Sequence, residues 1–125
     1  MNRWDLIGLD LKPRLPEIVS SSEAARLIAF DLDAGESLAD HEVHERAWLV
    51  VIAGEVEVTT RAEDVATGGV GFLAEFAPGE RHEVVATTKS RLLLILAPWP
   101  GDGHPGTMSL QEKLYIRRHA AKRVE

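Results

Sequence analysis

Histidines are the residues of this chain with the most adaptable chemistry, and three of the five lie among its strand-like segments: His41, His44 and His82. Neutral imidazole binds divalent metal ions, and imidazole also moves protons near neutral pH. A set of these three side chains, with or without Glu45, would form a mainly nitrogen site for Zn²⁺, Mn²⁺, Fe²⁺ or Ni²⁺. The spacing therefore raises the hypothesis of a divalent metal site.

A metal-free interpretation stays open beside it. In a straight strand His44 would point away from His41, because successive side chains alternate faces, and Glu45 would lie about 13 Å from His41 at roughly 3.3 Å per residue. A turn between residues 41 and 47 would remove both objections. Without a metal, His41 and His82 would be neutral, hydrogen-bonded residues that line a pocket, and His44 would lie in a solvated loop.

The elements that must position these residues are short apolar segments separated by turn residues. Residues 55–59 alternate polar and apolar side chains, which predicts a half-buried strand, whereas residues 48–52 and 92–96 are continuously apolar, which predicts strands covered on both faces. Strands are predicted at Arg26–Leu32, Ala47–Ile52, Glu55–Thr60, Val70–Phe76, Glu83–Thr87 and Arg91–Ala97. Short antiparallel strands at this spacing predict an all-β sandwich or barrel.

The two ends of the chain differ from this strand region. Residues 1–24 contain Pro13 and Pro16 and are expected to form an N-terminal segment that packs on a barrel of residues 25–97. Residues 98–106 are rich in proline and glycine and are expected to form a linker. Ser109 and Glu112 then have the spacing of a capping box, so residues 98–125 are expected to end in a C-terminal helix.

Two motifs framed by glycines resemble the two sequence motifs of the cupins. Their residues are Gly35, His41 and Gly54 in the first motif, and Gly71, Pro78-Gly79 and His82 in the second. The resemblance covers about residues 25–97 and implies an antiparallel double-sheet jelly-roll barrel with His41 and His82 near its mouth. Independently of it, Gly54 is expected to take a positive φ between two strands, and Pro78-Gly79 is suited to a type II turn that directs His82 to the barrel mouth.

The chain departs from the cupin motifs at the residues that bind metal. Cupins with a metal typically use two histidines and a glutamate of the first motif and one histidine of the second. Here the second histidine and the glutamate are replaced by Val43 and Ala47, and the asparagine that ends the second motif is replaced by Ala86. Because a divalent metal is usually bound by three or more protein ligands, His41 and His82 alone would form a poor metal site.

This degenerate motif favours a single-domain cupin that binds a small molecule. The expected pocket contains His41, Ala47, Leu49, Phe72 and His82. Two alternatives remain: a metal-dependent cupin enzyme (an oxygenase, isomerase or decarboxylase), in which the metal polarises a carbonyl or binds oxygen, and a non-catalytic dimeric structural module.

Composition excludes several other classes of function. The chain has no cysteine, so disulfides and thiolate metal sites are excluded. The net charge is −6, and residues 1–108 carry 9 Lys and Arg against 18 Asp and Glu, which disfavours nucleic acid as a partner. No apolar run reaches the roughly 18 residues of a membrane span, and the N-terminus lacks a signal-peptide pattern, so a cytoplasmic protein is expected.

A homodimer is also expected from the strand pattern. A sheet with an apolar outer face and an exposed edge needs cover, and the resemblance implies pairing of two copies through such a sheet. Trp99 and the C-terminal helix are the candidate contacts.

Overall fold

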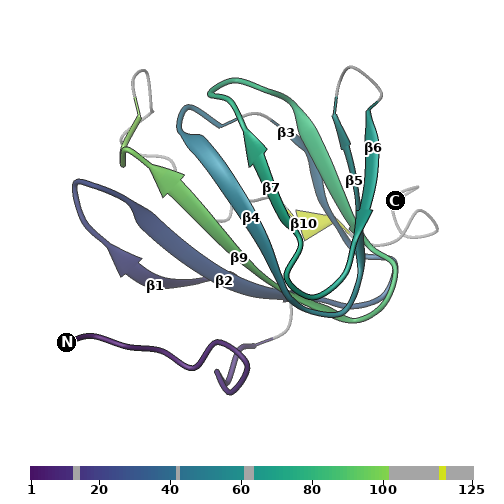
Figure 1. Ribbon diagram of the computed structural model, residues 1–125, viewed down its shortest axis with the longest axis horizontal. Helices are drawn as coiled ribbons and strands as arrows, with labels where there is room; N and C mark the ends of the chain where they lie inside the picture. The colour runs from purple at the N-terminus through teal and green to yellow at the C-terminus, as the bar shows by residue number, and fades with distance from the viewer. Residues whose placement is uncertain (13–14, 42, 61–63, 102–115, 118–125) are drawn as a thin grey trace.

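Two five-stranded antiparallel sheets make up the computed structural model, which describes residues 1–12, 15–41, 43–60, 64–101 and 116–117 (Figure 1). One sheet has the order β1-β2-β9-β4-β7 and the other the order β10-β3-β8-β5-β6. The strands are β1 (Glu17–Ser21), β2 (Arg26–Leu32), β3 (Ser37–His41), β4 (Arg46–Ala53), β5 (Val56–Thr60), β6 (Val65–Gly68), β7 (Leu73–Phe76), β8 (His82–Ala86), β9 (Ser90–Ala97) and β10 (Ile116–Arg117). The predicted all-β, double-sheet architecture is confirmed.

The core lies between the two sheets, where alternate residues of each strand point inward. Along β4 the even-numbered residues from Arg46 to Ile52 are half-buried, while Ala47, Leu49 and Val51 are at most 1% exposed. Strands β5 and β8 show the same alternation over most of their length, whereas Ile28, Ala29 and Phe30 of β2 are all buried. This period of two follows from the pleat of a strand, which sends successive side chains to opposite faces. The interior is almost entirely aliphatic, with Phe30 and Phe76 as its buried aromatic residues.

Glycines with positive φ form the tight connections, as the sequence predicts. Gly54 has a φ of 84° between β4 and β5. A methyl group there would lie 2.2 Å from the carbonyl oxygen of Lys89 and 2.4 Å from Oγ of Ser90, because the hairpin packs against the start of β9. Only glycine combines this backbone conformation with so close an approach.

Six predicted strands are present, and the structure adds four that the sequence did not indicate. Strand β7 begins at Leu73 and not at Val70, because Gly71 has a φ of 89° and the N–H of Phe72 donates to the carbonyl of Gly69, which forms a turn. Strands β1, β3 and β6 are short and mostly polar or exposed, so they lack the apolar signal that marks the central strands. Residues 17–21, in the segment that was expected to pack on the barrel, thus form a strand at the edge of one sheet.

The C-terminal helix predicted after Ser109 lies outside the described residues, apart from Ile116–Arg117. At these two residues the structure has strand β10, which pairs with β3, in place of helix. Pairing satisfies backbone groups at the exposed edge of β3, and a β-branched isoleucine suits an extended conformation.

Residues 98–101 were expected to form a linker, but in the structure they pack against the barrel. Trp99 packs against the hydrophobic core, and the guanidinium of Arg26 lies 4.0 Å from the centre of its ring. The peptide bonds preceding Pro98 and Pro100 are cis. Within the described part of the chain, no helix has the length and apolar character needed to cross a bilayer.

Candidate functional site: the His82 end of the barrel

The two histidine-containing segments meet at one end of the barrel. His41, at the end of β3, is the cross-strand partner of His82, at the start of β8. Next to this pair, the N–H of Gly79 donates to the carbonyl of Val43 over 2.8 Å, which joins the turn before β8 to the loop after β3. Backbone pairing therefore brings together two segments that lie about 40 residues apart in the sequence.

A type II turn positions His82, as predicted. Pro78 and Gly79 are its central residues, Gly79 has a φ of 79°, and the N–H of Glu80 donates to the carbonyl of Ala77 over 3.0 Å. Proline presets the first central φ and glycine supplies the positive second one. The carboxylate of Glu80 accepts a further hydrogen bond from the N–H of Ala77, so the turn is closed from both sides.

The imidazole of His82 is buried and held in one orientation. It is 3% exposed and stacks on Phe76, with ring centres 3.9 Å apart and an interplanar angle of 8°. Its Nδ1 lies 3.0 Å from the carbonyl oxygen of Glu80. Because a carbonyl oxygen only accepts, Nδ1 carries the proton, and Nε2 of the neutral ring is a hydrogen-bond acceptor.

The chain bends at His44 and Glu45, as the metal hypothesis required, but the bend separates these two side chains. His44 is exposed, whereas Val43 and Glu45 are 3% and 1% exposed. The N–H of Gly101 donates to Oε2 of Glu45 over 2.8 Å. The buried carboxylate therefore ties the segment after β9 to the loop before β4.

Apolar residues occupy two motif positions that carry metal ligands in cupins, those of Val43 and Ala47, and also the position of Ala86 that ends the second motif. Val43, Ala47 and Ala86 are all members of the hydrophobic core, at 3%, 0% and 0% exposed. Leu49 is fully buried beside them and Phe72 packs against the same core from a partly exposed position. Of the residues expected to line a pocket, Ala47, Leu49 and His82 are thus inside the barrel, and only the backbone of His41 is described.

The described donors do not fit a metal centre. No group of three His, Asp or Glu side chains that could hold a metal ion occurs among the described residues. The His44 side chain is exposed and the Glu45 carboxylate accepts from a backbone amide. The described side chains here are a fixed imidazole and the apolar residues around it.

Two parts of this site were not anticipated from the sequence. The stack of Phe76 on His82 had a weak signal, an aromatic residue just before the turn of the second motif. The contact of Glu45 with Gly101 had none, since it joins residues 56 positions apart. The remaining two histidines, His104 and His119, lie outside the described residues.

Comparisons with known proteins give the fold. No protein-family model matches the sequence, and no curated protein matches it. An RmlC-like cupin protein from Desulfovibrio desulfuricans has a TM-score of 0.70 and 24% identity over 78% of this chain and 97% of that chain. A conserved protein with a double-stranded β-helix domain from Klebsiella pneumoniae has a TM-score of 0.72 and 18% identity, covering 81% of this chain and 93% of that one.

An enzyme also appears among the similar structures. Oxalate decarboxylase has a TM-score of 0.58 and 24% identity over 62% of this chain, but over only 22% of its own. With the two-sheet architecture and the two motif segments in place, these likenesses show that the chain has the cupin fold.

Proposed function

We propose that this cupin-fold chain is a binding module for a small polar molecule, held at the His82 end of the barrel. The observation that supports it most is the fixed, 3% exposed imidazole of His82 among apolar residues. Binding sites of small molecules are mostly apolar, with a few polar groups that set orientation and specificity. A rigid imidazole supplies such a group without an entropic cost on binding.

The hydrogen-bonding chemistry of imidazole guides the choice of ligand class. The ring of His82 is fixed on the Glu80 carbonyl through Nδ1, and a fixed polar group among apolar side chains is typical of sites that orient a polar ligand. Imidazole forms hydrogen bonds with hydroxyl groups in its neutral form and with carboxylates in its charged form. We therefore propose hydroxylated and carboxylate-bearing compounds as the ligand class.

The metal-dependent enzyme is the weaker alternative. Its support is the fold, since a cupin-fold decarboxylase is among the similar structures, but one fold hosts many unrelated functions. Against it stand the apolar Val43 and Ala47 at two ligand positions. The structural-module alternative requires that the barrel end bind nothing.

A binding screen distinguishes the three. Thermal unfolding of the wild type is followed with single small hydroxy acids, dicarboxylates and sugars at millimolar concentration, beside His82→Gln and the exposed-site control His44→Ala. A ligand present at 100 times its Kd stabilises the fold by about 2.7 kcal/mol, which raises the midpoint by several degrees. We expect such a shift in the wild type and in His44→Ala, and its loss in His82→Gln.

Elemental analysis of the tag-free protein completes the test. Near-stoichiometric metal after incubation with Zn²⁺, Mn²⁺, Fe²⁺ or Ni²⁺, lost in both His41→Ala and His82→Ala, would replace the proposal by the metalloenzyme. No shift with any compound and no metal would leave the structural module. A shift that persists in His82→Gln would place binding elsewhere.

A further inference from the structure

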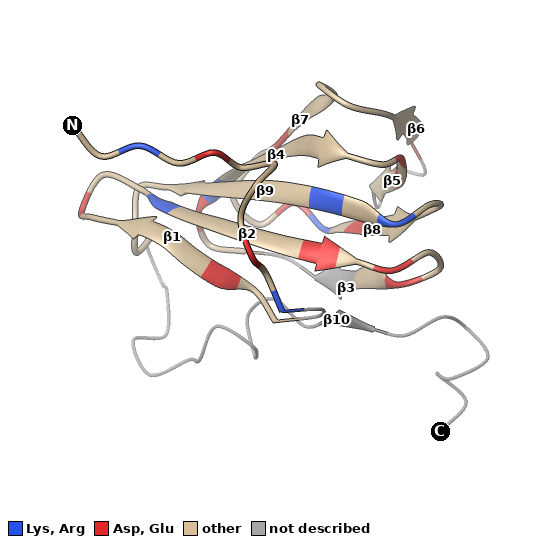
Figure 2. Ribbon diagram, turned by 90° about the horizontal axis from the view of Figure 1, so that it is seen from below, with Lys and Arg blue, Asp and Glu red and all other residues tan. Residues whose placement is uncertain are grey.

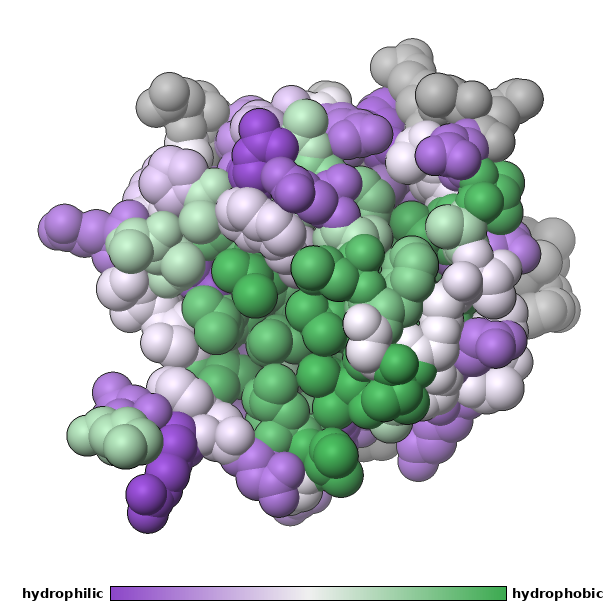
Figure 3. Space-filling model, in the orientation of Figure 1, coloured by the Kyte–Doolittle hydropathy of each residue, from purple (hydrophilic) through white to green (hydrophobic). Residues whose placement is uncertain are grey.

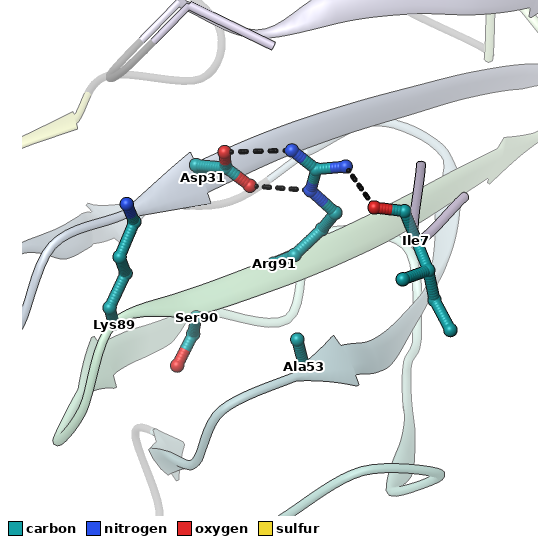
Figure 4. Close-up of a pocket in the computed structure, with 6 residues that line it drawn as sticks. All are labelled: Ile7, Asp31, Ala53, Lys89, Ser90 and Arg91. Carbon is teal, nitrogen blue, oxygen red and sulfur yellow. Dashed lines mark hydrogen bonds and ion pairs between the residues drawn. The ribbon is translucent and has the colours of Figure 1, made fainter. Parts of the chain in front are cut away.

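Arg91 fixes the first nine residues of the chain on the outer side of the β1-β2-β9-β4-β7 sheet (Figure 4). Its Nε and Nη2 donate to the two carboxylate oxygens of Asp31 over 2.8 and 3.0 Å. Its Nη1 donates to the carbonyl oxygens of Leu6, Ile7 and Leu9. The hydrogen bond to Asp31 raises the pKa of Arg91 despite the opposing effect of burial. Arg91 therefore anchors the start of the chain to β2 and β9.

These first residues form one wall of a groove. Figure 2 shows them running beside β4 and then across β9 toward β2. The groove has a volume of about 430 Å³ and is lined by residues 4–7, 50–52 and 70–71. Figure 3 shows the apolar surface that gathers over β4 and β7 on this side of the molecule. The volume lies within the range of about 300–1,000 Å³ that is usual for sites of small molecules.

The opposite wall of the groove is the turn between β6 and β7, which backbone hydrogen bonds fix to β4. The N–H of Gly71 donates to the carbonyl of Val51, and the N–H of Val51 donates to the carbonyl of Phe72, both over 2.9 Å. One wall is thus held by the side chain of Arg91 and the other by the backbone of β4. Because both walls are in place without a ligand, binding would require little ordering of the chain.

Asp5 is the single charged residue among those that line the groove. Its Oδ1 accepts a hydrogen bond from the N–H of Ile7 over 3.2 Å, and the N–H of Gly8 donates to its carbonyl over 3.1 Å. These two hydrogen bonds form a turn in which the aspartate side chain is held by the backbone. Oδ2 of Asp5 has no hydrogen-bond or ion-pair partner in the part of the chain that the structure describes, so it is available to a bound molecule.

We propose that this groove binds a small amine whose ammonium group pairs with Asp5 and whose apolar body lies between the two walls. The other side chains that line the groove are apolar, among them Trp4, Ile52 and Val70. An indole ring attracts a cation through its face, so Trp4 adds to the preference for an ammonium group. The net charge of −6 favours a cation in the same way.

The exposure of the groove sets the expected affinity. Ile7 and Val70 are 76% and 74% exposed, so a bound molecule would remain partly in contact with water. An exposed ion pair contributes little, and a ligand of about ten non-hydrogen atoms is expected to bind with a Kd on the order of 1 mM. The groove adjoins the last residues of β4, whereas the His82 end adjoins the first. Binding here is therefore independent of the function proposed for His82.

The test is an NMR titration of the full chain with 2-phenylethylamine at about neutral pH, where an alkylamine is protonated. It follows the backbone amide signals of Ile7 and Gly71, one from each wall. Two compounds with the same ring are the controls: uncharged 2-phenylethanol and anionic 3-phenylpropanoate. We expect saturating shifts with the amine, and binding of the alcohol and of the anion that is weaker by about 5-fold or more.

Two matched substitutions each remove one exposed negative charge. Asp5→Asn keeps an oxygen that accepts from the N–H of Ile7, so the turn is preserved. Glu57→Gln changes an exposed residue of β5 in the other sheet. We expect Asp5→Asn to weaken amine binding by about 5-fold and to remove the preference for the amine over the alcohol, whereas Glu57→Gln should bind the amine as the wild type does.

Four results would overturn the proposal. They are the absence of saturating shifts at Ile7 and Gly71 up to about 20 mM amine, equal binding of the amine and the alcohol by the wild type, equal effects of Asp5→Asn and Glu57→Gln, and shifts of the same two amides when the protein alone is concentrated. The last result would mean that a second copy of the chain occupies the groove. Unchanged amide signals elsewhere in the spectrum establish that each variant is folded.

Discussion

A methyl group at Gly101 tests whether the segment after β9 is docked on the loop before β4. The added carbon would lie 2.7 Å from the carbonyl oxygen of His44 and 2.9 Å from its carbonyl carbon. Because backbone atoms cannot move aside cheaply, the segment must retreat and release the 2.8 Å hydrogen bond from Gly101 N–H to Oε2 of Glu45. A hydrogen bond to a charged group contributes about 1.5–3 kcal/mol, and here the carboxylate is 1% exposed.

The assay is urea unfolding followed by tryptophan fluorescence, with Gly69→Ala as the matched control. Gly69 has no positive φ, and the nearest atom to an added methyl group there lies 3.8 Å away. Both substitutions restrict the unfolded chain in the same way, so their difference isolates the contact. We expect Gly101→Ala to be less stable than Gly69→Ala by about 1.5–3 kcal/mol. A difference under about 0.5 kcal/mol, with an unprotected Gly101 amide in hydrogen exchange, would refute the docking of this segment.

Three further outcomes follow from the same structure. Gly54→Ala is expected to lower the free energy of unfolding by more than about 3 kcal/mol, because the new methyl group combines a φ of 84° with a 2.2 Å approach to a backbone carbonyl oxygen. Chemical unfolding measures this loss, and a loss below about 1 kcal/mol would contradict the expectation. Arg91→Gln is expected to expose the first nine residues to limited proteolysis and to lower the free energy of unfolding by about 2 kcal/mol or more. Arg46→Gln, in an exposed ion pair, is expected to change the free energy of unfolding by less than about 1 kcal/mol, and equal effects of the two substitutions would refute the role of Arg91. Nitrogen NMR of neutral His82 should show the proton on Nδ1, and an Nε2 proton would contradict the hydrogen bond to the Glu80 carbonyl.

The central strands were predictable because their signal is local. Arg26–Leu32 has the bounds that the sequence indicated. Strands β4 and β8 differ from the prediction by one residue at each end, and β5 and β9 by one residue at their first end only. Each is apolar or alternating over its own length, so the pattern needs no knowledge of the neighbours. Positive φ at Gly54 and Gly79 was predictable for the same reason, since turn chemistry depends on adjacent residues.

Edge strands and the docked segment were not predictable. Strands β1 and β10 form by pairing with β2 and β3, and their own residues carry little strand signal. Residues 98–101 have the composition of a linker. They lie against the barrel because Trp99 packs on the hydrophobic core and the N–H of Gly101 donates to the buried carboxylate of Glu45. Such contacts depend on where distant parts of the barrel come together.

In the candidate site, too, some features were predictable from the sequence and others depend on tertiary contacts. The sequence by itself determined that His41 and His82 occupy matching places in two glycine-framed motifs, and that two metal-ligand positions are apolar. The tertiary structure decided that Glu45 is buried while its neighbour His44 is exposed, and that Phe76 stacks on His82. The physical reason is that motif spacing is encoded along the chain, whereas the burial and orientation of a side chain depend on the surfaces that folding places around it.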